Sequence, residues 1–185
     1  MYEIRPYKEK DKAEVQRICL LNAGCIDKPL EKQRYILIMY CNYYIEQEPE
    51  NCFVVTNEED RAVGYIICSE DYEKYAETFN RVYIPQAQCL GNRQYMDAKL
   101  DMLSHALFKK KYPAHLHIDI DPEYQRIGAG SRLMNTLMEH LRTKGVHGLM
   151  LVVGTDNLRG RNFYKKNKFK ELMVTKSGTA MAIEI

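Results

Sequence analysis

The chain has little net charge, no Cys-x-x-Cys pair and no long apolar run, and each absence excludes a class of protein. Its 27 Lys and Arg residues against 25 Asp and Glu give a formal net charge of +2. A charge so close to zero provides no electrostatic basis for binding nucleic acid or an anionic membrane surface. No apolar run approaches the roughly eighteen residues that a membrane-spanning helix needs. We therefore expect neither a nucleic-acid nor a membrane partner.

The six cysteines are spaced far apart, and most of them lie within apolar patterns. This distribution favours reduced core residues over disulfide bridges or zinc ligands. The first residues, MYEIRPYKEKDK, carry charges where a signal peptide requires an apolar core. We expect a cytoplasmic protein, and the length of 185 residues predicts a single domain spanning 1–185.

The most informative stretch, residues 114–142, predicts a strand, a loop and an amphipathic helix. Polar and apolar residues alternate over 114–121, as in a strand with one apolar face, until Pro122 ends the pattern. From Gly130 onward the apolar residues fall at helical spacing, and Gly145 supplies a left-handed cap after the last turn.

The loop between this strand and helix, residues 125–130, has the properties of a pyrophosphate-binding turn. Gly128 and Gly130 allow close approach of a ligand, and the loop leads into a helix N-terminus with free N–H groups. A dinucleotide-binding fingerprint would need a third glycine where Leu133 stands, and no Gly-Lys-Ser/Thr follows as in a P-loop. The loop therefore favours a phosphate ligand of another kind.

The remaining pattern, Gln/Arg-x-x-Gly-x-Gly/Ala after a strand, resembles the acetyl-CoA loop of the GNAT N-acetyltransferase superfamily. The apolar run at 147–153 is typical of a parallel strand covered on both faces. The segment from Asn157 to Phe169 then resembles the second motif of the family, with two departures. Gly160 replaces a small alanine, and Lys168 replaces a glycine and must take a turn that glycine would enter more easily.

The resemblance implies an α/β GNAT fold with helices on both faces of a mixed, mostly antiparallel sheet of six or seven strands. The strands at 114–121 and 147–153 should run parallel and splay apart, because a right-handed strand-helix-strand unit joins them. Periodicity adds strands at 2–5, 52–56, 62–69, 170–175 and 179–185, and helices from a cap at Asp11 and over 29–46. Gly64 is expected at a bulge or a close approach in its strand.

A helical insertion is expected at about residues 70–112, where a minimal GNAT chain would proceed almost directly to its fourth strand. Insertions of this kind usually serve as lids or specificity elements. Within it we predict a packing stripe formed by Leu100, Leu103, Leu107 and Phe108.

The resemblance implies acetyl-CoA as the acyl-donor substrate. The backbone N–H groups of Ile118 and Ile120 would then pair with pantetheine and contact the acetyl oxygen. Tyr164 would protonate the departing thiolate or only pack, and Asn157 would bind pantetheine or cap its helix. The expected binding set is Ile118, Ile120, Gln125, Arg126, Ile127, Gly128, Ala129, Gly130, Ser131, Asn157 and Tyr164.

The general base is expected on the polar face of the fourth strand, which presents His115, His117 and Asp119. An amine with a pKa of about 10 must lose a proton before attack, and His117 and Asp119 lie closest to the splay. Two alternatives stay open. The His-x-His-x-Asp spacing could bind a metal, although no companion ligand is visible and none is expected, or it could form a buried polar network.

The run PAHLHIDIDPEYQ is similar to the acetyltransferase-like module of O-GlcNAcases and its free-standing bacterial relatives. The implied function is acetyl-CoA-dependent transfer of an acetyl group to a primary amine of an unidentified acceptor. A catalytically silent acetyl-CoA-binding or interaction module is the alternative. The joint presence of the loop glycines with Asn157 and Tyr164 favours the enzyme, and a homodimer is a candidate assembly.

Overall fold

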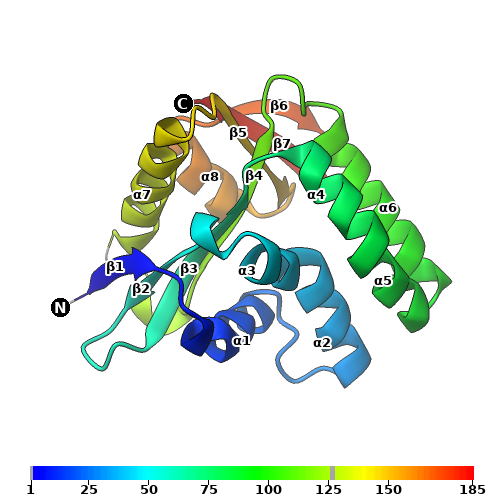
Figure 1. Ribbon diagram of the computed structural model, residues 1–185, viewed down its shortest axis with the longest axis horizontal. Coiled ribbons are helices and arrows are strands. Elements are labelled where there is room, and N and C mark those ends of the chain that lie inside the picture. Colours follow the sequence, from blue (N-terminus) through cyan, green and yellow to red (C-terminus); the bar gives the residue numbers. More distant parts are fainter. Residues whose placement is uncertain (1, 126–127) are drawn as a thin grey trace.

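Seven strands form one mixed sheet in the order β1-β2-β3-β4-β5-β7-β6, in a computed structural model that describes residues 2–125 and 128–185 (Figure 1). The strands are β1 (Glu3–Pro6), β2 (Phe53–Thr56), β3 (Ala62–Ser69), β4 (Ala114–Ile120), β5 (Gly148–Gly154), β6 (Lys170–Val174) and β7 (Gly178–Glu184). The β4–β5 pair is parallel and the other five pairs are antiparallel. This confirms the predicted α/β fold class and its mixed, mostly antiparallel sheet.

Helices cover both faces of the sheet. They are α1 (Lys12–Asn22), α2 (Leu30–Leu37), α3 (Tyr43–Gln47), α4 (Tyr72–Thr78), α5 (Ile84–Leu90), α6 (Asn92–Ala106), α7 (Ala129–Thr143) and α8 (Leu158–Lys166). Short 3-10 turns occur at Glu9–Asp11, Pro49–Asn51 and Pro122–Tyr124. Two π-helical turns, Ile38–Asn42 and Phe79–Tyr83, join α2 to α3 and α4 to α5. The helix expected over 29–46 is therefore present, with a π-helical turn in its middle.

The two parallel strands diverge almost as soon as they meet. Their register contains two pairs, Ala114 with Leu149 and His115 with Met150. On their other sides, residues 115–120 of β4 pair with β3, and β5 pairs with β7 along its whole length. The sheet therefore opens between β4 and β5, as predicted.

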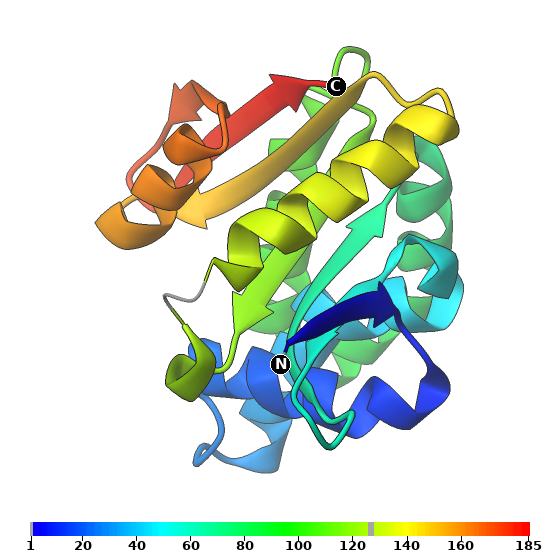
Figure 2. The same ribbon diagram turned by 90° about the vertical axis from the view of Figure 1, so that its left-hand side faces the viewer.

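Helix α7 closes one face of the sheet and lies across it (Figure 2). Its buried side chains are Ala129, Leu133, Met134, Leu137, Met138 and Leu141, at the predicted helical spacing. They pack on apolar residues of β2 to β5. Fully burying each large apolar side chain contributes about 1.5–3 kcal/mol, so this face anchors the helix that follows the glycine loop.

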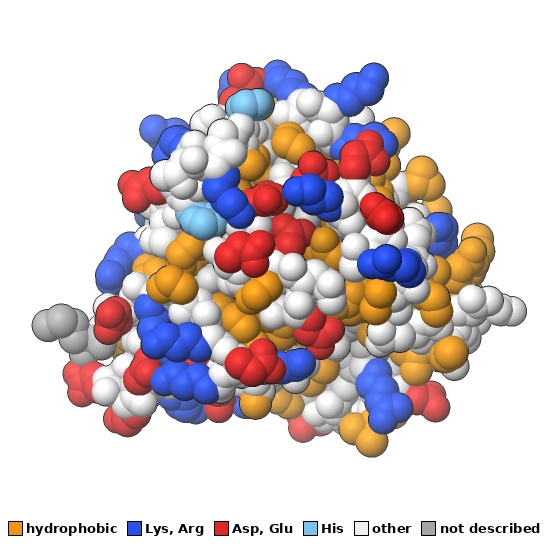
Figure 3. All heavy atoms as spheres, viewed as in Figure 1, with side chains coloured by type: hydrophobic (Ala, Val, Ile, Leu, Met, Phe, Trp, Pro, Cys, Tyr) orange, Lys and Arg blue, Asp and Glu red, His pale blue; other side chains and the backbone are white. Residues whose placement is uncertain are grey.

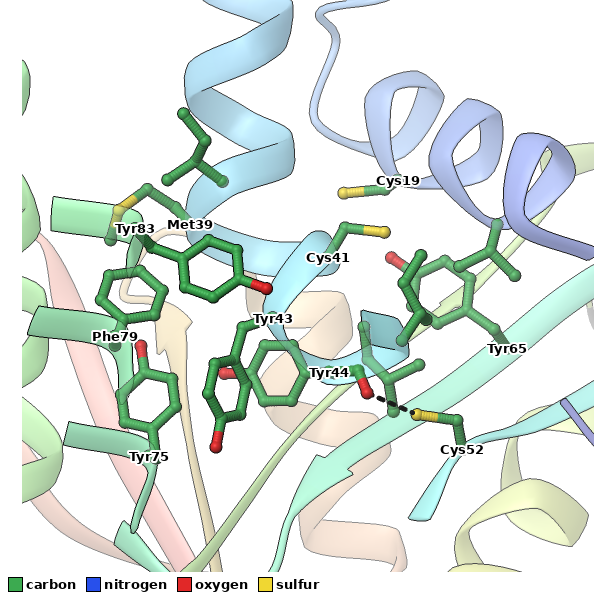
Figure 4. Close-up of a cluster of buried hydrophobic side chains, with 14 of the residues drawn as sticks. Cys19, Met39, Cys41, Tyr43, Tyr44, Cys52, Tyr65, Tyr75, Phe79 and Tyr83 are labelled. Atoms are coloured by element: carbon green, nitrogen blue, oxygen red, sulfur yellow. Dashed lines mark hydrogen bonds between the residues drawn. The ribbon is translucent and has the colours of Figure 1, made fainter. Parts of the chain in front are cut away.

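The other face carries a core that is rich in tyrosine. Helices α1 to α6 pack there, and Tyr43, Tyr44, Tyr65, Tyr75 and Tyr83 are each at most 2% exposed (Figure 4). Their rings meet mainly edge to face, with centroids 4.7 Å apart for Tyr43 and Tyr75. Such pairs contribute about 0.5–1.5 kcal/mol beyond the area that they bury.

The six cysteines are free thiols, and five of them are buried, as the apolar patterns predicted. Cys89 is the exposed one. Among the described ranges, no helix is both long enough and apolar enough to cross a membrane. On the face shown in Figure 3, acidic and basic side chains are interspersed, in keeping with the small net charge.

Two sequence predictions about packing were wrong. Leu100, Leu103 and Leu107 are 55–63% exposed, because α6 turns Ala98, Met102 and His105 toward the tyrosine core instead. Both faces of α6 carry apolar residues at helical spacing, so periodicity alone could not select the inner one.

Asp11 does not cap α1 with its side chain. Its carboxylate instead accepts hydrogen bonds from both Nη atoms of Arg5, at 2.7 and 2.9 Å, and from the backbone N–H of Lys8 at 2.9 Å. A bidentate pair with arginine is stronger than a single bond to a helix N–H group, so Arg5 takes the carboxylate.

Gly64 is required by a close approach, as predicted. A Cβ atom there would lie 2.5 Å from Cδ1 of Ile120 and 2.8 Å from Cγ1 of Val55. We expect Gly64→Ala to lower the free energy of unfolding by about 1–3 kcal/mol in urea titration. Gly154→Ala is the control, because its Cβ would meet its nearest neighbour at 3.9 Å. Equal stability of the two variants would contradict this account.

Candidate active site

The splay between β4 and β5 opens a cleft with a volume of about 500 Å³. Residues from β4, the following loop, α7 and α8 line it. The predicted site residues on this cleft are Ile118, Asp119, Ile120, Gln125, Gly128, Ala129, Gly130, Ser131, Asn157 and Tyr164. Arg126 and Ile127 lie outside the described residues. His117 does not line the cleft, and its side chain meets the tyrosine core.

Beyond His115, the edge of β4 that faces the cleft has no strand partner in the described part of the chain. The N–H group of Asp121 donates to the carbonyl of Val63 at 2.9 Å, so residues 117, 119 and 121 face β3. By the alternation of an antiparallel ladder, the N–H groups of Ile118 and Ile120 point the other way, where β5 has diverged. The carbonyl of Ile120 accepts hydrogen bonds from Nε2 of Gln125, at 2.9 Å, and Nδ2 of Asn22, at 3.3 Å.

The glycine loop ends at the N-terminus of α7. Gly128 occupies the N-cap position with φ +80°, a left-handed conformation that glycine adopts without strain. A Cβ on Gly130 would lie 3.1 Å from Cε2 of Phe163, so this glycine lets α8 pack close to α7. The free N–H groups of the first turn of α7 then face the cleft and form a site suited to an anion.

Asn157 caps α8. Its Oδ1 accepts a hydrogen bond from the N–H group of Gly160 at 2.8 Å, and a Cβ on Gly160 would lie 2.9–3.1 Å from the Asn157 amide. The glycine that departs from the family pattern therefore makes room for the cap. Lys168 adopts φ +68°, the left-handed turn predicted for it. A contact between Asn157 and pantetheine stays a prediction.

Sequence reasoning missed Arg159 and Lys166, two cations that also line the cleft. Nη2 of Arg159 donates to Oε1 of Gln125 at 2.6 Å and so connects α8 to the loop after β4. No local motif marks Arg159, because its partner lies 34 positions away in the sequence. Together these cations make the cleft favourable for phosphate groups.

Asp119 has a carboxyl group whose pKa burial raises. Its Oδ2 accepts a hydrogen bond from the hydroxyl of Tyr65 at 2.6 Å. Burial raises the pKa of Asp119 to about 7, against the opposing effect of the Tyr65 hydrogen bond. Burial and the nearby charge of Asp119 raise the pKa of Tyr164 well above its ordinary value, so its hydroxyl stays protonated. A weak acid and a base of neutral pKa thus share one cleft.

The two histidines of β4 are held differently. Nε2 of His117 lies 3.1 Å from the hydroxyl of Tyr44, and burial together with His105 lowers the pKa of His117 to about 3. His115 is 1% exposed, and neither of its ring nitrogens has a hydrogen-bond partner within the described chain. No His, Cys, Asp and Glu residues in the described ranges form a group of three placed to hold a metal ion.

Comparison with known proteins identifies the fold and the family to which the site belongs. A family model described as the acetyltransferase (GNAT) family matches residues 16–169. Protein O-GlcNAcase of Rattus norvegicus is 25% identical over 182 residues, which cover 90% of this chain and 20% of that protein. The chain therefore spans about a fifth of the length of this relative.

Two solved structures share the fold. The crystal structure of SsHAT has a TM-score of 0.86 and 25% sequence identity, and the match covers 99% of this chain and 98% of that one. The PaiA N-acetyltransferase of Thermoplasma acidophilum, solved in complex with coenzyme A, has a TM-score of 0.62 and 17% identity, over 100% and 99% of the two chains. The second likeness is one of fold alone.

The hydrogen bond from Tyr65 to Asp119 leads to a prediction about the pKa of Asp119. We expect Tyr65→Phe to raise the pKa of Asp119 above about 7, because a donor that stabilises the carboxylate is removed. Carbon NMR titration of labelled aspartate would measure the shift. The control is Tyr44→Phe, whose hydroxyl contacts His117 instead. A pKa that stays the same or falls in Tyr65→Phe would show that the hydrogen bond does not tune Asp119.

Proposed function

Because this chain belongs to the acetyltransferase (GNAT) family, we propose that it transfers the acetyl group of acetyl-CoA directly to a primary amine. The observation that supports this most is the position of Asp119 and Tyr164 on one cleft, beside the unpaired backbone of β4. Such a cleft can accept a proton from an attacking amine and supply one to a departing thiolate. The acceptor itself is not identified.

The residues that line the cleft suit the chemistry of acetyl-CoA. Gly128 opens the N-terminus of α7 to a pyrophosphate, and Arg159 and Lys166 add positive charge nearby. The N–H groups of Ile118 and Ile120 would pair with the pantetheine arm and donate to the acetyl oxygen. Gln125, Ala129, Gly130, Ser131 and Asn157 complete the proposed binding set, together with Arg126 and Ile127.

The chain's own residues divide the proton transfers. Bound acetyl-CoA would supply the thioester carbonyl carbon that the amine attacks. Asp119, ionised above a pKa of about 7, takes the proton of the amine, directly or through water. Tyr164 keeps its proton, because burial and Asp119 raise its pKa, and donates it to the leaving sulfur. We assign the base to Asp119 rather than His117, whose pKa of about 3 makes it a weak base.

Three further assignments belong to this proposal. Residues 1–185 would form one domain, in which the segment at 70–112 is an insertion beside the acceptor. The cytoplasm would be the compartment, since the six cysteines are free thiols. A homodimer stays a prediction, for which sedimentation equilibrium is the direct measurement.

A thiol-release screen tests the function. Acetyl-CoA is incubated with the protein and a broad panel of amines, and free CoA thiol and acetylated product are measured together. We expect thiol and N-acetylated product to appear in equal amounts with at least one amine. Retained acetyl-CoA affinity without thiol release from any amine would favour a silent acetyl-CoA-binding module instead.

Substitutions at two glycines of similar conformation test whether the pyrophosphate binds at residue 128. Gly128 and Gly145 lie at the two ends of α7, with φ of +80° and +74°, and a Cβ would meet no atom within 4 Å at either. Valine therefore introduces similar backbone strain at both positions. We expect Gly128→Val to weaken acetyl-CoA binding by about tenfold or more in calorimetry and Gly145→Val to leave it unchanged. An equal loss of acetyl-CoA affinity in the two variants would show that residue 128 is not part of the binding site.

The acid role is tested by Tyr164→Phe. This change keeps the ring that packs in α8 and removes the proton, so turnover should fall by about a hundredfold while acetyl-CoA affinity changes little. Tyr112→Phe makes the same chemical change away from the cleft and should keep full turnover. Wild-type turnover in Tyr164→Phe, under conditions where chemistry limits the rate, would make Tyr164 a packing residue.

A further inference from the structure

An apolar stripe runs along the outer face of α6. We call it the α6 stripe, and its members are Met96, Leu100, Leu103 and Leu107, which are 55%, 60%, 55% and 63% exposed. Leu107 is the C-cap residue of the helix and keeps helical dihedral angles, φ −60° and ψ −29°, so the stripe is continuous. Helix α6 lies at the edge of the molecule away from α7, and hydrophobic side chains gather along this edge (Figures 1 and 3). The exposure of the stripe shows that no described segment of the chain covers it.

The inner face of the same helix is apolar as well. Ala98 and Met102 are 0% and 5% exposed and pack in the tyrosine core. A helix on the surface of a monomer normally turns charged residues to water, whereas a helix that is apolar all round is buried on every side. Among residues 96–107, all of which the structure describes, Asp97 is the only charged side chain at the most exposed positions. This pattern indicates that a second body covers the outer face of α6.

The spacing of the α6 stripe indicates that the second body is another α-helix. Successive members of the stripe are four, three and four positions apart. This alternation is the heptad pattern by which two helices pack side by side along a seam. At a rise of 1.5 Å per residue, the stripe from Met96 to Leu107 is about 16 Å long. A helix with an apolar seam of similar length and spacing would cover it, and α6 itself, with 15 residues, is such a helix.

The charges at the two ends of the stripe favour a second copy of this chain in an antiparallel orientation. Asp97 lies beside the N-terminal end of the stripe, and the exposed Lys110 follows its C-terminal end. In an antiparallel pair, Lys110 of the partner subunit would approach Asp97, and two-fold symmetry would repeat this contact at the other end. The pair of Asp97 with Arg93, at 3.7 Å, is exposed to solvent and contributes little, so it does not compete strongly. In a parallel pair, Asp97 would face its own copy and repel it.

The size of the stripe suits a reversible dimer. Four large apolar side chains that are each more than half exposed present a patch on the order of 400 Å², and patches of this size on a monomer often mark interaction sites. Two such patches face to face, together with the charged residues at their ends, would bury on the order of 1,000 Å². Specific interfaces begin at about this size, and those at the lower limit belong to weak complexes. We therefore expect a dissociation constant in the micromolar range.

From these observations we propose that the α6 stripe is the interface of a homodimer, in which α6 pairs antiparallel with α6 of a second copy of this chain. Met96 packs against Leu107 of the partner subunit, and Leu100 packs against Leu103 of the partner subunit, across a two-fold axis. The inner face of α6 then completes the core of its own chain, while the outer face holds the two copies together. This inference does not depend on the proposed transfer of acetyl groups.

Sedimentation equilibrium of the full chain, from about 1 μM to about 1 mM, tests the interface. We expect the wild type to pass from monomer to dimer and Leu100→Glu to raise the dissociation constant at least about tenfold, because a charge would be buried in the seam. Glutamate is a good helix former, so the fold should survive, and Leu103→Glu is the second variant should Leu100→Glu fail to fold. Leu158→Glu, at a 65% exposed leucine of α8, is the control and should dimerise as the wild type does. A wild type that stays monomeric, or equal dimerisation of the Leu100 and Leu158 variants, would overturn the proposal.

Disulfide cross-linking tests the orientation of the two helices. Cys89, the exposed cysteine, is first replaced by serine, and Met96→Cys and Leu107→Cys are then made in separate chains. We expect a cross-linked dimer when the two proteins are mixed and oxidised, and none from either protein alone. In the antiparallel pair, the two copies of one position lie about 16 Å apart, whereas a disulfide requires Cα atoms within about 7 Å. Cross-links within each protein alone would show a parallel pair and overturn the antiparallel arrangement, and the absence of cross-links from all three samples would overturn the interface.

Discussion

The separation of β4 from β5 after two residue pairs is the constraint on which the site depends. A strand in the middle of a sheet normally satisfies its backbone on both sides, and unpaired buried N–H groups are costly. Here residues 115–120 of β4 pair with β3, and β5 pairs with β7 along its whole length, so each strand follows a different neighbour after the two shared pairs. The N–H groups of Ile118 and Ile120 point into this opening, and for that reason the proposed binding of acetyl-CoA and the proposed chemistry are both placed there.

Much of the fold and part of the site could be predicted from the sequence, because these features follow from local sequence patterns. The alternation in β4, the glycines flanking the start of α7 and the apolar run of β5 specify a strand-loop-helix-strand unit, whose handedness makes the strands parallel. The left-handed turn at Lys168 and the close approach at Gly64 could also be predicted, because each residue is unusual for its local position. These features depend on neighbours in sequence or on a single conformational requirement.

The features that could not be predicted depend on partners distant in the chain. Nε of Arg5 donates to Oδ1 of Asp60, 55 positions away, and Nη2 of Arg159 donates to Oε1 of Gln125, 34 positions away. The outward face of α6 was mistaken for the inward one because both carry apolar residues. The choice of Asp119 rather than His117 as the proposed base depends on how deeply each side chain is buried and on which tyrosine it contacts. The spacing of residues along a strand does not reveal either property.

The tyrosine-rich core explains how polar groups can lie so deep in this protein. A tyrosine ring packs as an apolar body while its hydroxyl reaches a polar partner. Tyr44 meets His117 at 3.1 Å and Tyr65 meets Asp119 at 2.6 Å, so the same residues that exclude water from β4 also hold its titratable side chains in place. Phenylalanine in their place would desolvate Asp119 without a donor, and the carboxyl would be harder to ionise at neutral pH. The composition of the core is therefore part of the chemistry of the cleft.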